Sequence, residues 1–144
     1  MKGCSYKKAI YFLSKRIRSE KETREYLAKK GVPFSEIDDI ITKLIELNYL
    51  NDELFAQIWI KDRVEFKNYG KNLIIFELKR KGIDEEIILK SIQKIFTEEL
   101  EREIAINYLV KKNINPLEEK KRAYQVLRRK GFSSNVINIL INFN

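Results

Sequence analysis

Basic side chains gather at three places in this sequence, each directly before a glycine. The clusters are Lys29 and Lys30 before Gly31, Lys79, Arg80 and Lys81 before Gly82, and Arg128, Arg129 and Lys130 before Gly131. A fourth run consists of Lys120, Lys121 and Arg122. Ammonium and guanidinium groups bind phosphates and carboxylates through charge-assisted hydrogen bonds. Their recurrence along one chain predicts a surface for a polyanion, either a nucleic acid or an acidic protein face.

The same clusters also have a purely structural explanation. Glycine adopts positive φ at little cost and therefore often ends a helix. Cations in the last helical turn are favoured by the negative end of the helix dipole. Each cluster taken alone fits an ordinary helix end. The binding hypothesis requires the three clusters to act together, and both explanations stay open at this point.

The residue types that most enzymes use are scarce in this chain. It contains no histidine and a single cysteine, Cys4, which excludes a disulfide within the chain, Cys/His zinc sites and histidine-activated nucleophiles. The five glycines are scattered and form no phosphate-binding loop. Acidic runs at 84–86 and 98–103 are typical of the first turn of a helix. We therefore expect no enzymatic activity, no metal and no cofactor.

Composition indicates a helical protein with an anionic partner. The 144 residues carry a net charge of +8, are 44% hydrophobic, and include only five Gly and two Pro. No apolar run reaches the roughly 18 residues of a membrane span. The amino-terminal stretch lacks the apolar core and cleavage site of a signal peptide. We expect no membrane association and a cytoplasmic location, which the single cysteine also fits.

A repeat of about fifty residues organises the chain, with Gly31, Gly82 and Gly131 at equivalent positions. Leucine stands four residues before each glycine, and isoleucine stands six and ten residues after it. These residues are Leu27, Leu78 and Leu127, then Ile37, Ile88 and Ile137, then Ile41, Ile92 and Ile141. Positions six and ten residues after the glycine are one helical turn apart, so they line one helix face.

The pattern predicts an all-α fold of nine helices and no sheet. The expected helices are 5–17, 20–30, 35–47, 52–67, 71–81, 84–96, 98–112, 116–130 and 134–142, with a capping box at Ser19 and a helix start at Asn115 and Pro116. Three helices per repeat give three units, 1–50, 51–97 and 98–144, in an elongated, curved array. We expect a monomer, and aromatic residues Phe55, Trp59, Phe66 and Phe76 in its core.

Three segments of the chain carry a family resemblance. They are "LNYLNDELFAQIWI" at 47–60, "YGKNLIIFELKRKGIDEEII" at 69–88 and "KKRAYQVLRRKGFSSNVI" at 120–137. Through them the chain, from about residue 6 to 141, resembles the RecX family of bacterial regulators of the RecA recombinase. Asn48 and Asn51 replace a frequent glycine and the usual aspartate, and "GVPF" at 31–34 replaces the usual "GF". These departures concern caps and turns.

The resemblance implies a specific partner and effect. It implies three tandem three-helix units that bind RecA, chiefly the RecA filament on single-stranded DNA, and inhibit its ATP hydrolysis, strand exchange and co-protease activity. Such a protein modulates recombination, DNA repair and the SOS response and has no active site of its own. Our hypothesis is that the four basic clusters face the filament, where linked contacts raise avidity.

A second hypothesis needs no RecA. Three basic units could follow a nucleic-acid backbone directly, with Tyr26, Tyr69 or Tyr124 stacking on bases. Weak DNA binding of this kind could also accompany the first function. High-affinity binding to naked DNA distinguishes the two hypotheses.

Overall fold

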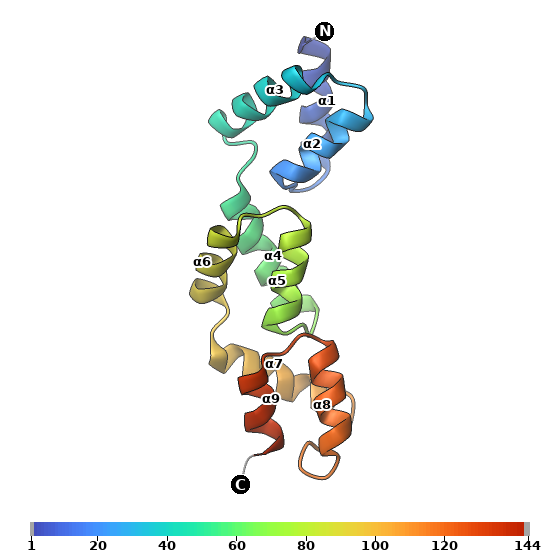
Figure 1. The fold of residues 1–144 in the computed structure, drawn as a ribbon, viewed down its shortest axis with the longest axis vertical. Coiled ribbons are helices and arrows are strands. Elements are labelled where there is room, and N and C mark those ends of the chain that lie inside the picture. Colours follow the sequence, from blue (N-terminus) through green and yellow to red (C-terminus); the bar gives the residue numbers. More distant parts are fainter. Residues whose placement is uncertain (1, 143–144) are drawn as a thin grey trace.

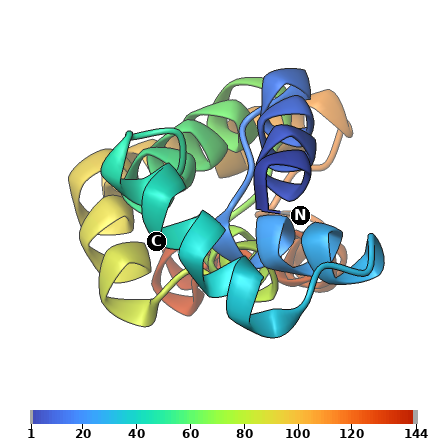
Figure 2. The same ribbon diagram turned by 90° about the horizontal axis from the view of Figure 1, so that it is seen from above.

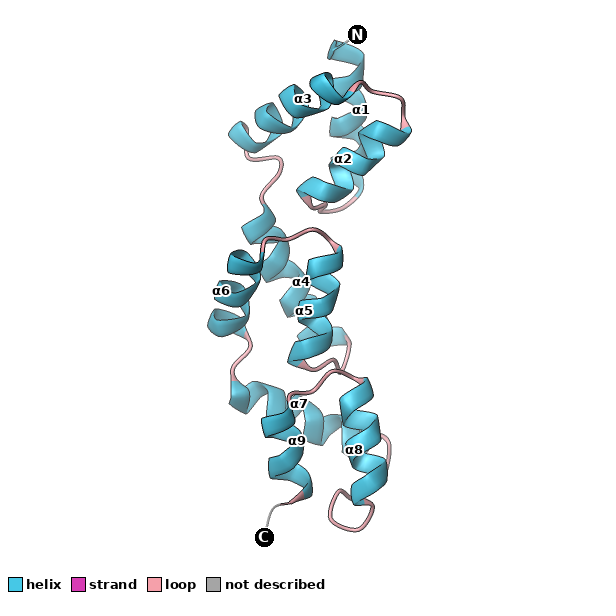
Figure 3. Cartoon of the chain, in the orientation of Figure 1, coloured by secondary structure: helices cyan, strands magenta, loops and turns pink. Residues whose placement is uncertain are grey.

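A computed structural model describes residues 2–142; Met1 and residues 143–144, at the outer edges of the first and third predicted units, lie outside the described residues. Within that range the chain forms helices and loops without a strand (Figure 3). The helices are α1 (Lys2–Lys15), α2 (Glu20–Lys29), α3 (Phe34–Glu46), α4 (Asp52–Phe66), α5 (Lys71–Arg80), α6 (Glu85–Ile95), α7 (Glu98–Lys111), α8 (Lys120–Arg129) and α9 (Ser134–Ile141).

The helices are arranged in three groups along one long axis. Figure 1 shows α1–α3 at one end, α4–α6 in the middle and α7–α9 at the other end. Seen along the axis, the groups overlie one another (Figure 2). The second helices of the groups, α2, α5 and α8, form a column in which the amino end of α2 meets the carboxyl end of α5, and the amino end of α5 meets the carboxyl end of α8 (Figure 1). The predicted fold, an elongated array of three-helix repeats, is confirmed. The unit boundaries at residues 51 and 98 stay a prediction.

The three repeat glycines end the helices of this column. Gly31, Gly82 and Gly131 have φ of 81°, 80° and 84°, the left-handed region that glycine adopts most easily. The amide after each glycine returns to the carbonyl of the repeat leucine, at 3.1 Å in all three units: Val32 to Leu27, Ile83 to Leu78 and Phe132 to Leu127. This is the Schellman arrangement, which satisfies carbonyls that a helix end leaves free.

Side-chain caps explain several helix starts. Ser19 and Glu22 form the predicted capping box, and Asn51 accepts the amide of Leu54 at 3.1 Å. The predicted start at Asn115 is wrong, because α8 begins at Lys120. The Asn115 side chain instead accepts the amide of Leu117 at 2.9 Å and closes a turn before the helix.

The core consists of two separate clusters. One lies within α1–α3 and includes Leu27, Ile41 and Leu44. The other runs through α4–α9 and includes Leu78 and Leu127. All nine repeat leucines and isoleucines are buried, which agrees with the predicted shared face of the isoleucines, and burial of each such side chain stabilises the fold by about 1.5–3 kcal/mol. The second and third groups therefore share a hydrophobic core, whereas the first group has its own.

The expectation for the four aromatic residues is half correct. Phe55 is fully buried and Trp59 is half-buried against the larger cluster. Phe66 and Phe76 are exposed by 70% and 55%, which contradicts their predicted place in the core. Helical spacing alone did not reveal that these two side chains point away from the neighbouring helices.

Candidate polyanion-binding interface

The basic clusters recur along the long axis of the molecule, because the second helices of the three groups form a column. The clusters before the glycines occupy the carboxyl ends of α2, α5 and α8, one in each group (Figure 1). Nine of the eleven predicted cations are exposed: Lys29, Lys30, Lys79, Arg80, Lys120, Lys121, Arg122, Arg128 and Arg129. The remaining two, Lys81 and Lys130, are half-buried. This difference follows from where consecutive helices of the column meet.

The first joint lies between the amino end of α2 and the carboxyl end of α5. The hydroxyl of Ser19 donates to the Lys81 carbonyl at 2.8 Å. The Lys21 ammonium donates to the Arg80 carbonyl at 3.4 Å. In return, the Lys81 ammonium donates to the Glu22 carboxylate at 3.1 Å. The joint is therefore made of charged and polar groups that satisfy the ends of both helices.

The second joint repeats this arrangement between α5 and α8. The amides of Gly70 and Asn72 each donate at 2.8 Å, to the carbonyls of Lys130 and Gly131. A Cβ at Gly70 would overlap the backbone of Phe132. The close approach of two backbones thus requires glycine at this position.

The side chains of Lys81 and Lys130 make contacts within these joints. The Lys81 ammonium lies 5.2 Å from the centre of the Trp59 ring, besides its contact with Glu22. The Lys130 ammonium lies 5.5 Å from the centres of both the Tyr69 and the Tyr108 rings. Cation–π contacts of this kind stabilise partly buried cations. These two lysines are held by the fold, and the nine exposed cations are the ones open to a ligand.

Two carboxylates of the first joint have perturbed pKa values. Burial raises the pKa of Glu22, but the Ser19 amide and the Lys81 ammonium outweigh burial, so the pKa lies below its usual value. Burial also raises the pKa of Asp52, and the Glu20 amide, which donates to it at 2.9 Å, does not reverse the shift. The pKa values of the two carboxylates are therefore shifted in opposite directions.

The run Lys120, Lys121 and Arg122 forms the first turn of α8. This is the positive end of the helix dipole, where cations are unfavourable by about 0.3–1 kcal/mol each. Arg122 pairs with Glu119 at 3.2 Å, and the two side chains are 58% and 40% exposed. The helix-end explanation that suits the other clusters therefore does not apply to this run.

Exposed aromatic side chains lie beside arginines on α5 and α8. The guanidinium of Arg80 lies 5.8 Å from the Phe76 ring, and that of Arg128 lies 6.0 Å from the Tyr124 ring. Tyr124 is 43% exposed. Of the other predicted stacking residues, Tyr26 is half-buried and stacked on Phe12 at 4.0 Å. Sequence reasoning missed Phe76, whose place one turn before Arg80 was the available signal.

A hollow of about 340 Å³ lies between α5, in the column, and the neighbouring helix α4. Its lining residues are Trp59, Arg63, Glu77, Arg80 and Lys81. Glu77 accepts the Trp59 indole N–H at 3.1 Å and the Arg63 guanidinium at 3.0 Å. Arg63 also pairs with Asp62 at 2.7 Å. These contacts hold the Trp59, Arg63 and Glu77 side chains in place, and Arg80 is the exposed cation among the lining residues.

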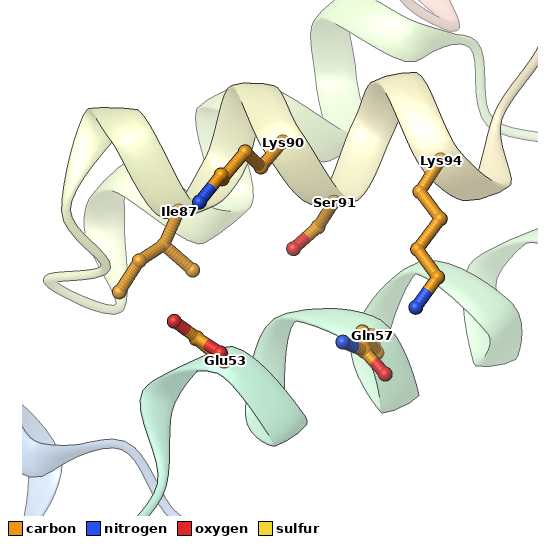
Figure 4. A pocket seen from close by; sticks show the side chains of 6 residues that line it. All are labelled: Glu53, Gln57, Ile87, Lys90, Ser91 and Lys94. Atoms are coloured by element: carbon orange, nitrogen blue, oxygen red, sulfur yellow. The ribbon is translucent and has the colours of Figure 1, made fainter.

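A second groove, of about 250 Å³, lies between α4 and α6 (Figure 4). Its lining residues are Glu53, Gln57, Ile87, Lys90, Ser91 and Lys94. Lys90 and Lys94 stand one turn apart on α6, which is not one of the helices of the column. Over residues 2–142, no group of three Cys, Asp or Glu side chains is placed to hold a metal ion. Nor does that range contain a helix with the length and apolarity to cross a bilayer.

These features define the class of protein, an all-α array of three-helix repeats with cations recurring along one helical column. Family models described as the first and second three-helix domains of RecX match residues 6–44 and 51–91. The chain belongs to the RecX family. Relatives in this family are named regulatory proteins.

Individual relatives agree with this assignment. The chain is 36% identical over 138 residues to the Regulatory protein RecX of Bacillus velezensis, matching 93% of this chain and 52% of that protein. It is 36% identical to that of Finegoldia magna, matching 93% of this chain and 68% of that protein. The crystal structure of RecX from Lactobacillus salivarius superimposes with a TM-score of 0.89 at 26% identity, over 98% of this chain and 94% of that one. The chain spans about half the length of the Bacillus relative.

Proposed function

We propose that this chain binds RecA and the RecA filament on single-stranded DNA, and lowers the filament's ATP hydrolysis, strand exchange and co-protease activity. It acts as a monomer in the cytoplasm and catalyses no reaction itself. The exposed cations face the filament, a repeating polyanionic track. Family membership supports the choice of RecA as the partner.

The observation that carries this proposal is the repetition of exposed cations along one helical column. Arg80, Arg128 and Arg129 are exposed at the ends of consecutive second helices. A rigid array with one cluster in each group can contact several filament subunits or phosphates together. Linked weak contacts then act with a high effective concentration. The cations in the first turn of α8 add support, because the helix dipole does not favour them there.

The direct test measures ATP hydrolysis by RecA on single-stranded DNA while this protein is added below one copy per RecA. We expect the rate to fall at these ratios, because a filament modulator acts on many subunits from few sites. Raising the salt concentration should weaken the effect, since phosphate contacts release counterions. An unchanged rate at every ratio would contradict the proposal.

A charge-reversal variant tests the column itself. Arg128→Glu combined with Arg129→Glu should weaken filament binding by more than tenfold, because two exposed cations of the third cluster are lost. The matched control is Lys90→Glu combined with Lys94→Glu, which reverses two exposed cations on α6. Equal binding by both variants would exclude the third cluster from the interface. Circular dichroism checks that each variant remains folded.

A second candidate function is direct binding of single-stranded nucleic acid. The exposed pairs Phe76 with Arg80 and Tyr124 with Arg128 favour it, since an aromatic ring stacks on a base while the arginine binds phosphate. Fluorescence anisotropy on a labelled oligonucleotide without RecA is the test. Tight binding that Phe76→Ala and Tyr124→Ala weaken would favour this function. Weak binding with strong inhibition of RecA would favour the first.

A further inference from the structure

The turn between α2 and α3 has the same backbone geometry as the two turns that form joints, yet it stands open. The φ of Gly31 is 81°, against 80° and 84° for Gly82 and Gly131. A Cβ at Gly82 would overlap Lys21, and one at Gly131 would overlap Leu73. A Cβ at Gly31 would meet nothing within 4 Å. Among the described residues, no helix covers the Gly31 turn.

The two joints show which structural element packs on such a turn. Each holds the amino-terminal turn of a helix, whose donors reach carbonyls at or next to the glycine: the Ser19 hydroxyl at one joint and the Gly70 amide at the other. The lysine before Gly82 also reaches the third residue of the incoming helix, Glu22, at 3.1 Å. A helix that begins with a small cap and a carboxylate at its third position therefore fits this surface.

Charge at the open turn makes the carboxylate more important there than at the joints. Lys29 and Lys30 are both exposed. Trp59 and Tyr108, which contact the lysines of the two joints, each stand 23 residues before the glycine of their turn. The equivalent residue of the first turn is Lys8, which is also exposed. A third cation thus stands at the repeat position of that aromatic residue, and the Lys30 ammonium lies instead 5.5 Å from the ring of Tyr26 on its own helix.

An apolar side chain lies close to these cations in the chain. Phe34 is the first residue of α3 and is 76% exposed. Glu85 and Ser134 occupy the equivalent positions after the other two turns. Phe34 therefore offers a bound helix an apolar surface, which the equivalent residues of the two joints do not offer.

A second copy of this chain is a poor occupant of the turn. In a second copy, the amino end of α8 would have to dock, because it is the repeat equivalent of the amino ends of α2 and α5. The first turn of α8 consists of Lys120, Lys121 and Arg122. Docking it on Lys29 and Lys30 would bring five cations together. Its cap is Glu119, where the joints have Ser19 and Gly70. Like charges and the larger cap residue both oppose a head-to-tail continuation of the column.

We propose that the α2–α3 turn, formed by residues 29–31 with Lys8 and Phe34, docks the amino-terminal turn of an acidic helix from a partner protein. The bound helix begins with a small cap residue and places a carboxylate at its third position against Lys30. This contact continues the column by one helix. It goes beyond the proposed function, because it needs neither DNA nor the exposed sides of α5 and α8.

The test uses the whole chain labelled with ¹⁵N and a synthetic peptide that copies residues 17–30, the segment seated on the Gly82 turn. Millimolar peptide should shift the amide signals of Lys30, Gly31 and Val32. A peptide with Glu20→Lys and Glu22→Lys should cause no shift. In the protein, Lys30→Glu should raise the dissociation constant about tenfold, the effect of losing about 1.4 kcal/mol.

Lys112→Glu is the matched control variant. Lys112 also ends a helix, is exposed, and lies 5.8 Å from the Tyr108 ring, as Lys30 lies 5.5 Å from the Tyr26 ring. Its reversal should leave peptide affinity unchanged. Shifts at Gly82 without shifts at Gly31 would overturn the proposal, because the peptide would then be replacing α2 at its own joint. So would the absence of any shift, or self-association of the wild type that Lys30→Glu abolishes.

Discussion

Glu101 on α7 accepts the backbone N–H of Lys71, the first residue of α5, at 2.8 Å. Only 2% of Glu101 is exposed, and the same carboxylate accepts the hydroxyl of Ser133 at 2.7 Å and its amide at 3.0 Å. One buried side chain thus binds the amino ends of both α5 and α9. A negative charge is favoured at both positions by the helix dipoles. Glu101 therefore fixes the third group of helices to the second.

Replacing this carboxylate should destabilise the protein strongly. Glu101→Leu leaves the partly buried donors of Lys71 and Ser133, three hydrogen bonds in all, without their acceptor, and we expect a loss of about 3 kcal/mol in the free energy of unfolding. Asp52→Leu is the matched control, because Asp52 stands at the equivalent repeat position, is half-buried and accepts the Glu20 amide. We expect it to cost about 1 kcal/mol. Urea denaturation measures both values, and equal losses would contradict the assigned role of Glu101.

The three repeat glycines should tolerate alanine to different degrees. Gly31→Ala places a side chain at positive φ in open space, which costs about 1–2 kcal/mol. Gly131→Ala has the same backbone cost and also overlaps Leu73, including its backbone, which adds about 1–3 kcal/mol. Gly82→Ala overlaps side-chain atoms of Lys21, including its Cβ, but no backbone atom among its nearest neighbours, and its cost should fall between the other two. Thermal denaturation of the three variants gives the order, and a larger loss at Gly31 than at Gly131 would contradict it.

Stability should depend on pH through Glu22. Its pKa is lowered in the folded protein, so its stabilising contribution is present above the unfolded-state pKa of about 4.3 and is lost as the pH falls through the folded-state value. Glu22→Gln should therefore destabilise by about 1–2 kcal/mol at pH 7 and much less at pH 3. The raised pKa of Asp52 changes stability with pH in the opposite direction, but Asp52 is present in both the wild type and Glu22→Gln, so its effect cancels in the comparison.

The comparison of wild type and Glu22→Gln by urea denaturation at the two pH values isolates this carboxylate. Glu25→Gln is a suitable control, since the Glu25 side chain is 65% exposed and its contact with Lys21 is 3.8 Å long. That variant should change stability little at either pH. A Glu22→Gln effect of the same size at pH 3 and pH 7 would mean that its charge does not stabilise the joint.

Local patterns in the sequence predicted the helices, the glycine turns and the helix face that the repeat isoleucines share. Each of these depends on residues within a few turns of one another, and propensity, capping and periodicity act over that range. The helix start at Asn115 failed for a local reason as well. A short polar side chain can close a turn as readily as it caps a helix, and the sequence does not distinguish the two outcomes.

The joints were beyond sequence reasoning because their partners are far apart in the chain. Glu101 stands in an acidic run at the start of α7 and has the pattern of an ordinary first-turn acid. Its burial depends on Lys71 and Ser133, which are about thirty residues away on either side. The half-burial of Lys81 likewise depends on Glu22 of another group. The exposed clusters were visible in the sequence, and their division into joint and surface cations was not.

The two separate cores predict that the first group of helices opens independently. Leu27 and Leu127 are repeat equivalents, both fully buried, but Leu27 belongs to the core of α1–α3 and Leu127 to that of α4–α9. Either leucine-to-alanine change should cost about 3–5 kcal/mol locally. Leu27→Ala should lower the hydrogen-exchange protection of amides in α1–α3 and lower that of α4–α9 much less, because the joint at Ser19 and Lys81 is polar and Ile17 is the partly buried side chain of the first group that packs against the larger core.

Leu127→Ala should instead lower protection in all of α4–α9. The second and third groups share apolar contacts, so opening one removes buried surface from the other. Protection in α1–α3 should then fall less, since its own core remains intact. Native-state hydrogen exchange followed by mass spectrometry of peptides measures both patterns. A uniform loss of protection in both variants would mean that the polar joint through Ser19 and Lys81 couples the two cores as strongly as shared packing does.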